Sequence, residues 1–167
     1  MPIPNVQASD GNQSQGEASS FENLQVGSLF QANDSVSSLA TVGNGVLTGA
    51  LLLGRFISRG GAQTAAFTDT TDTANNILTA FQAFLLSVYT NPATKVSQTF
   101  KTRLLKPSSL VVRYINSTAD IATIAPGTGV TINGTATVAA GGFRDFLVTL
   151  NPAAGTVTMT NIGSGTD

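Results

Sequence analysis

The second half of the chain is a series of short segments in which apolar and polar residues alternate, separated by turn dipeptides such as Pro-Gly, Asn-Gly and Gly-Gly. Alternation with a period of two is typical of strands that turn one face to a core. Strands this short and this closely spaced predict an antiparallel sandwich or a jelly-roll-like barrel. The expected strands cover residues 99–105, 109–117, 120–124, 129–132, 135–140, 145–150 and 156–162.

Within this region, residues 126–150 predict a meander of adjacent strands. Asn133-Gly134 is the kind of dipeptide that closes a two-residue hairpin turn. The threonines that alternate with the apolar residues are expected to face outward and to form a flat hydrogen-bonding surface for a neighbouring subunit. The residues expected to face the core are Val130, Ile132, Ala136 and Val138.

One segment has the period of a helix instead. Apolar residues follow helical spacing through 74–89, and Asn91-Pro92 ends the pattern. Oxygen-bearing side chains at 69–73 suit the free N–H groups at a helix start, so Asp69 and Asp72 are assigned to that role. We therefore expect a mainly β fold with one amphipathic helix, and we interpret the apolar run Val46 to Ile57 as a buried strand or strand pair. The expected apolar face consists of Ile77, Leu78, Phe81, Phe84, Leu85 and Val88.

The chain divides by composition into an extended polar arm, residues 1–45, and a β-rich domain, residues 46–167. Residues 1–20 are rich in Gln, Ser, Asn and Gly, which alone bury too little apolar surface to order themselves. The arm either docks on another protein chain or folds back on its own domain as a loose first strand. In the docking interpretation its anchors are Phe21, Leu24, Leu29 and Phe30.

Charged residues make up only 10% of the chain and the formal net charge is −1, which argues against nucleic-acid binding. The chain contains no His and no Cys, so Ser-His-Asp and Cys-His catalysis and thiolate metal sites are excluded. We expect no catalytic residue, no cofactor and no metal. The most apolar run is too short to span a bilayer, and the N-terminus does not have the pattern of a signal peptide.

The remaining charges are candidates for contacts between subunits. Asp145 lies beside Arg144 and is interpreted as part of a surface or interface pair. A small basic patch is expected on adjacent strands, where its cations either are solvated or contact an acidic partner. The candidate interface charges are Lys101, Arg103, Arg113, Arg144 and Asp145, with Lys106 beside them.

Two stretches carry a family resemblance. LLLGRFISRGGAQTAAFTDTTDTANNILTAF (51–81) and the Thr/Gly-rich region 125–165 resemble small virion structural proteins of tailed bacteriophages, in particular head decoration (cement) proteins. The resemblance implies a non-enzymatic, β-rich protein, made in the host cytoplasm, that binds the major capsid protein at the outer surface of the head. It also implies a homotrimer, with a dimer left open.

The alternative is a receptor- or carbohydrate-binding module of a fibre or tail tip. Such modules usually stack exposed aromatic rings on sugars. The chain has no Trp, and its two tyrosines, Tyr89 and Tyr114, are at core-like positions. The aromatic content therefore favours the decoration protein.

Overall fold

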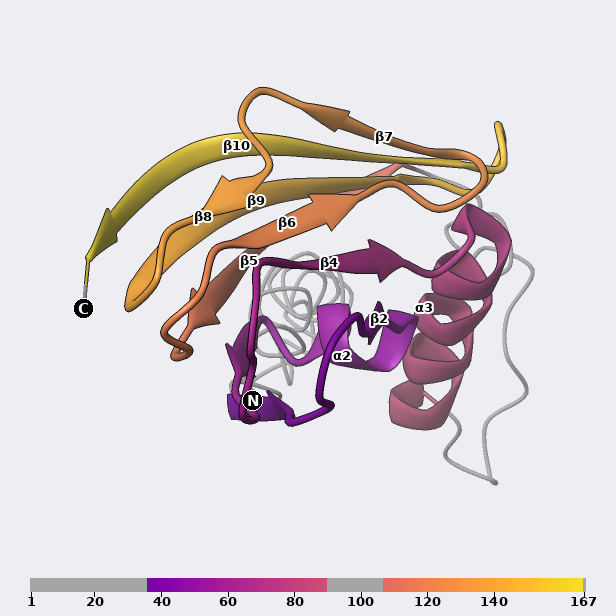
Figure 1. Cartoon of the computed structure of the whole chain (residues 1–167). Coiled ribbons are helices and arrows are strands. Elements are labelled where there is room, and N and C mark those ends of the chain that lie inside the picture. Colours follow the sequence, from indigo (N-terminus) through magenta and orange to yellow (C-terminus); the bar gives the residue numbers. More distant parts are fainter. Residues whose placement is uncertain (1–35, 90–106, 167) are drawn as a thin grey trace, which may run out of the picture. The chain divides into compact units, whose positions relative to one another are not determined.

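The computed structural model describes residues 36–89 and 107–166. This part of the chain is mainly β, with one six-stranded and one four-stranded sheet (Figure 1). The strand orders are β1-β3-β5-β9-β10-β7 and β2-β4-β6-β8. The elements are β1 (Val36–Leu39), β2 (Val46–Leu47), α2 (Gly49–Leu53), β3 (Phe56–Arg59), β4 (Phe67–Thr71), α3 (Ala74–Tyr89), β5 (Ser108–Asn116), β6 (Ala122–Ala125), β7 (Val130–Asn133), β8 (Thr137–Val138), β9 (Gly142–Asn151) and β10 (Thr156–Thr166).

Consecutive strands alternate between the two sheets from β1 to β9, and only the β9–β10 connection joins strands of the same sheet. Up to β6, each strand that returns to its sheet after passing through the other one lies parallel to its predecessor. The pairs β1–β3, β3–β5, β2–β4 and β4–β6 are all parallel, and so is β7–β10. Antiparallel pairing is confined to β5–β9, β9–β10 and β6–β8. The prediction of a purely antiparallel fold is therefore wrong.

The predicted meander is also wrong, for the same reason. β7 belongs to the six-stranded sheet and β8 to the four-stranded one, so Asn133-Gly134 carries the chain from one sheet to the other. Gly134 has a φ of 85°, a backbone conformation that favours glycine. Both Val130 and Val138 are buried, as predicted, although they lie in different sheets. Alternation predicts which residues of a strand are buried, but it does not specify which other strand pairs with it.

The helix predicted at 74–89 is confirmed as α3, with the same bounds. Thr73 caps its start, because its side-chain oxygen accepts from the Asn76 N–H at 3.2 Å. Ile77, Leu78 and Phe81 are buried, while Phe84 and Leu85 are half-buried. No helix in the described ranges is long and apolar enough to cross a membrane.

The predicted strand across 46–57 is corrected to a short strand, a helix and a second strand. Thr48 caps α2 by accepting from the Leu51 N–H at 3.3 Å. Gly49 lets α2 approach α3 closely, since a Cβ there would lie 2.7 Å from the Cβ of Ala80. A short run of apolar residues has no distinguishing period, so sequence alone does not separate strand from helix here.

Several sequence predictions fall outside the described residues. They include the strand at 99–105 and nearly all of the proposed arm. The last ten residues of the 1–45 range are described, and Val36–Leu39 form β1 at one edge of the six-stranded sheet.

Phe81→Ala should destabilise the protein by about 3–5 kcal/mol, since the ring is 2% exposed and its removal leaves a cavity in the core. Urea unfolding followed by circular dichroism measures the change. Thr79→Ala, at an exposed position of the same helix, is the matched control and should change stability by less than about 0.5 kcal/mol. Equal losses for the two variants would contradict the packing of α3.

Candidate binding surface

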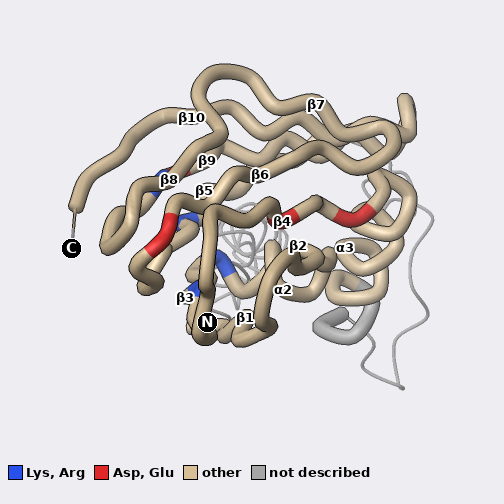
Figure 2. Tube along the Cα trace, viewed as in Figure 1, with Lys and Arg blue, Asp and Glu red and all other residues tan. Residues whose placement is uncertain are grey.

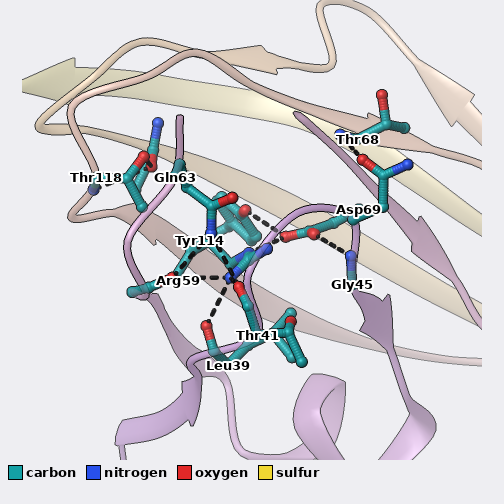
Figure 3. Close-up of polar contacts among 12 residues, drawn as sticks. Leu39, Thr41, Gly45, Arg59, Gln63, Thr68, Asp69, Tyr114 and Thr118 are labelled. Carbon is teal, nitrogen blue, oxygen red and sulfur yellow. Dashed lines mark hydrogen bonds and ion pairs between the residues drawn. The ribbon is translucent and has the colours of Figure 1, made fainter. Parts of the chain in front are cut away.

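A buried ion pair joins the two sheets. Arg59 on β3 and Asp69 on β4 both have fully buried side chains, and Arg59 Nε lies 2.7 Å from Asp69 Oδ2. The Tyr114 hydroxyl, from β5, donates to the same carboxylate oxygen at 2.6 Å (Figure 3). Since β3 and β5 are in the six-stranded sheet and β4 is in the other, the carboxylate connects both sheets through one oxygen atom.

The same cluster organises the chain between β1 and β2. The other carboxylate oxygen, Asp69 Oδ1, accepts from the Gly45 N–H at 2.8 Å. The guanidinium also stacks on the Phe67 ring, 4.5 Å from its centroid. No buried side-chain nitrogen or oxygen in the described residues lacks a hydrogen-bond partner. The remaining guanidinium N–H groups donate to the carbonyl oxygens of Leu39 (3.1 Å), Thr41 (2.6 Å), Gly60 (2.8 Å) and Gly43.

Burial, together with the hydrogen bond to Asp69, raises the pKa of the Tyr114 hydroxyl well above its ordinary value. A raised folded-state pKa means that the stability from this group is fully present below the unfolded pKa of about 10 and is lost at higher pH. The phenol is therefore a permanent hydrogen-bond donor at neutral pH. Each buried polar atom of the cluster has a hydrogen-bond partner, and we assign the cluster a structural role.

The assignment of Asp69 to the helix start is wrong, because Asp69 lies in the middle of β4. Asp72 does have the predicted role: its Oδ1 accepts from the Thr73 N–H and from Asn76 Nδ2, both at 2.8 Å. The cluster was missed in the sequence, although alternation places Asp69 on the same face as Phe67 and Thr71. Within the described ranges, no group of three or more His, Cys, Asp or Glu is placed to hold a metal ion.

The face of the six-stranded sheet that points away from the core, called here the outer face, carries a group of apolar side chains. Val111 and Leu147 are opposite each other on β5 and β9 and are 39% and 36% exposed. Val36 on β1 is 65% exposed and lies beside Phe56 on β3. Ile115 and Phe143 form a further cross-strand pair and are half-buried. These six residues form an apolar group across four adjacent strands.

A charge pair lies within this apolar group. Arg113 and Asp145 are opposite each other on β5 and β9 and form two parallel hydrogen bonds, Nε to Oδ1 and Nη2 to Oδ2, both of 2.8 Å. The Arg113 guanidinium also stacks on Phe143, 4.1 Å from the ring centroid. Gly165 on β10 makes room for that ring, because a Cβ there would lie 2.7 Å from it. The ring, the guanidinium and the carboxylate thus form one contiguous group within the outer face.

Of the five candidate interface charges, the structure brings together Arg113 and Asp145. The sequence had suggested Arg144 and Asp145. Asp145 pairs with Arg113 rather than with its sequence neighbour Arg144. Successive residues of a strand point to opposite faces, and Arg144 instead donates from Nε to the Thr137 carbonyl oxygen at 2.8 Å. Lys101, Arg103 and Lys106 lie outside the described residues, as do the proposed anchors Phe21, Leu24, Leu29 and Phe30.

Hydroxyl groups cover the rest of the outer face. Ser109, Thr149, Thr158 and Thr131 are in register across β5, β9, β10 and β7. The Ser109 and Thr149 hydroxyls are 3.1 Å apart, within hydrogen-bonding distance. Figure 2 shows long stretches of the fold without a charged residue, and β7 and β10 contain none. The outer face therefore offers apolar contact and neutral hydrogen bonds, with one charge pair.

Comparison of the chain with protein-family models, with curated proteins and with solved structures gives no match.

Asp69→Asn should destabilise the protein by about 3–5 kcal/mol, because it leaves the buried Arg59 guanidinium without a counter-charge. The control is Asp145→Asn, which breaks the partly exposed pair with Arg113 and should cost only about 0–1 kcal/mol. Urea unfolding of both variants at pH 7 measures the difference. A loss for Asp69→Asn no larger than that of the control would contradict the role given to the buried pair.

Proposed function

We propose that the protein is a virion structural protein that decorates the outer surface of a bacteriophage head and stabilises its capsomers by binding the major capsid protein. The outer face of the six-stranded sheet is the docking surface in this proposal. The supporting observation is its apolar group around the Arg113–Asp145 pair, which combines exposed aliphatic side chains with a defined polar contact. The phage assignment itself rests on the resemblance of residues 51–81 and 125–165 to decoration proteins.

The chemistry of the outer face suits permanent contact with another protein. Burying Val111 and Leu147 against a partner removes apolar surface from water, and each aliphatic side chain contributes on the order of 1 kcal/mol or more. The neighbouring threonine and serine hydroxyls donate or accept hydrogen bonds without the desolvation cost of a net charge. The Arg113–Asp145 pair is already neutralised within the chain, so it sets the register of a partner more than it attracts one over a distance.

The proposal includes an architecture and an assembly. Buried side chains from both sheets and the Arg59–Asp69 bridge support a sandwich of two facing sheets rather than a jelly-roll-like barrel. The homotrimer remains a prediction from the sequence, as does the location on the capsid surface. The partners in the proposal are the major capsid protein and further copies of this chain, with no nucleic acid, membrane or cofactor.

A receptor- or carbohydrate-binding module of a fibre or tail tip is the alternative. Its most suitable aromatic on the outer face is Phe143, which is half-buried and stacked on Arg113. A ring engaged in this way has less free area for a sugar than an exposed Trp or Tyr would have. We therefore favour the decoration protein.

The test is the binding of purified protein to heads of the parent phage that lack it, measured by co-sedimentation. Leu147→Lys places a charge in the centre of the apolar group and should weaken binding at least about tenfold, since a buried unpaired cation opposes docking. Val111→Lys should have the same effect from the opposite strand. Ile121→Lys is the matched control, because Ile121 is 52% exposed and precedes β6 of the other sheet.

Each outcome has a distinct meaning when all three variants keep the circular dichroism spectrum of the wild type. Loss of binding for Leu147→Lys and Val111→Lys alone supports docking through the outer face. Equal binding by all the variants would show that the outer face is not the docking surface. Failure of the wild-type protein to bind heads, combined with binding to host cells or their glycans, would replace the decoration protein with the receptor-binding module.

A further inference from the structure

The last strand of the described chain, β10, has an edge that its neighbour β7 covers only in part. β7 pairs with β10 over Val157–Thr160, whereas β9 pairs with β10 along its whole length to Thr166. The turn after β7 leaves the sheet at this point, with Gly134 in contact with Asn161. In the described part of the chain, no strand pairs with the outer edge of β10 beyond Asn161.

Strand alternation identifies the main-chain groups on this edge. The Arg113 N–H donates to the Arg55 carbonyl on the side of β3, so the N–H of its cross-strand partner Asp145 points to β10. The N–H and C=O of Gly163, the partner of Asp145, point back to β9. The next residue, Ser164, therefore directs its N–H and C=O to the open edge, and Thr166 does the same.

This edge lacks two of the features by which proteins protect exposed strands. Edge strands usually carry Lys, other charges or Pro, which prevent pairing with another chain. The segment Asn161–Thr166 has the sequence NIGSGT, without a charge or a Pro, and Ile162 is 54% exposed. A bulge between Asn161 and Gly163 is the one protective feature, and regular pairing with β9 resumes after it.

We propose that Ile162–Thr166 of β10 pairs with the same segment of a second copy of this chain, antiparallel and across a twofold axis at Ser164. In this register Ser164 is opposite Ser164 of the second copy, Gly163 is opposite Gly165, and Ile162 is opposite Thr166. The segment matches itself: glycines meet glycines, no like charges come together, and the Ser164 groups exchange two main-chain hydrogen bonds. The joined sheets form one continuous sheet of twelve strands, twice the six of each copy.

The other edges are less suited to this contact. In the four-stranded sheet the edge strands β2 and β8 have two residues each. In the six-stranded sheet the terminal strands are β1 and β7, with four residues each. The Leu39 carbonyl of β1 is already engaged by the Gly60 N–H and the Arg59 guanidinium. The contact at β10 uses a different surface from the outer face, and its twofold symmetry favours the dimer that the sequence resemblance leaves open beside the homotrimer.

A single-cysteine experiment tests the proposed register, and it is clean because the chain contains no Cys. The Cβ atoms of directly opposed residues in an antiparallel pair are about 4.5–5.5 Å apart, close enough for a disulfide after small movements. Ser164→Cys should therefore form a covalent dimer on mild oxidation of the full-length protein. Thr156→Cys is the control: it is exposed on the same strand, but roughly 50 Å from its counterpart in the proposed dimer, and should form no covalent dimer.

Removal of one main-chain donor tests the same contact without a thiol. Ser164→Pro deletes an N–H that points to the open edge and takes no part in the ladder to β9, so folding should be preserved. Ser164→Ala keeps that N–H. Sedimentation equilibrium up to about 1 mM should show a wild-type dimer, unchanged in Ser164→Ala and weakened at least about tenfold in Ser164→Pro. Thermal unfolding by circular dichroism reports whether the Pro variant is folded.

Three outcomes would overturn the proposal. The first is a wild-type protein that remains monomeric at about 1 mM, where even a weak strand pair with a Kd in the millimolar range is partly associated. The second is a folded Ser164→Pro variant that dimerises as well as the wild type. The third is cross-linking of Thr156→Cys as efficient as that of Ser164→Cys. If Ser164→Pro does not fold, the pair of cysteine variants decides alone.

Discussion

The buried contact between Arg59 and Asp69 is the constraint on which most of this structure depends. Two ions removed from water are costly unless each finds partners, and here the guanidinium and the carboxylate have partners on every polar atom. Those partners come from β3, β4 and β5 and from the chain between β1 and β2, so one cluster aligns both sheets and closes a long connection. An apolar cluster of equal volume would fill the same space, but it would not specify which strands face each other.

The passage of the chain from one sheet to the other accompanies parallel pairing from β1 to β6, while the long central strands pair antiparallel. β5, β9 and β10 are the longest strands, and their antiparallel pairs form the middle of the six-stranded sheet. The short strands surround this central group. The outer face lies mainly on the three long strands, and the β5–β9 ladder sets Val111 opposite Leu147 and Arg113 opposite Asp145.

Local patterns in the sequence predicted the helices and strands, but they could not predict which strands pair. The helix at 74–89 has a period that survives any tertiary context, and the strands from 109 to 162 were located to within a few residues because alternation and turn dipeptides are local signals. The helix α2 was missed because five apolar residues have no period. Parallel pairing was missed because alternation does not distinguish a neighbour in the same sheet from one in the other. The Arg113–Asp145 pair depends on the register between β5 and β9, which the sequence does not show. The sequence therefore suggested the adjacent Arg144 as the partner of Asp145.

The alternating path also has a consequence for how the chain folds. Apart from β9–β10, no two consecutive strands pair, so almost every ladder requires the closure of a long loop before its first hydrogen bond forms. Folding rates fall as the mean sequence separation of contacts rises, and this topology lies at the slow end of that relation. The β9–β10 hairpin is the only local nucleus among the described strands, and β5 and β7 pair with its two outer edges. In a cell, a newly made chain therefore presents unpaired strands for longer than a chain of successive hairpins would.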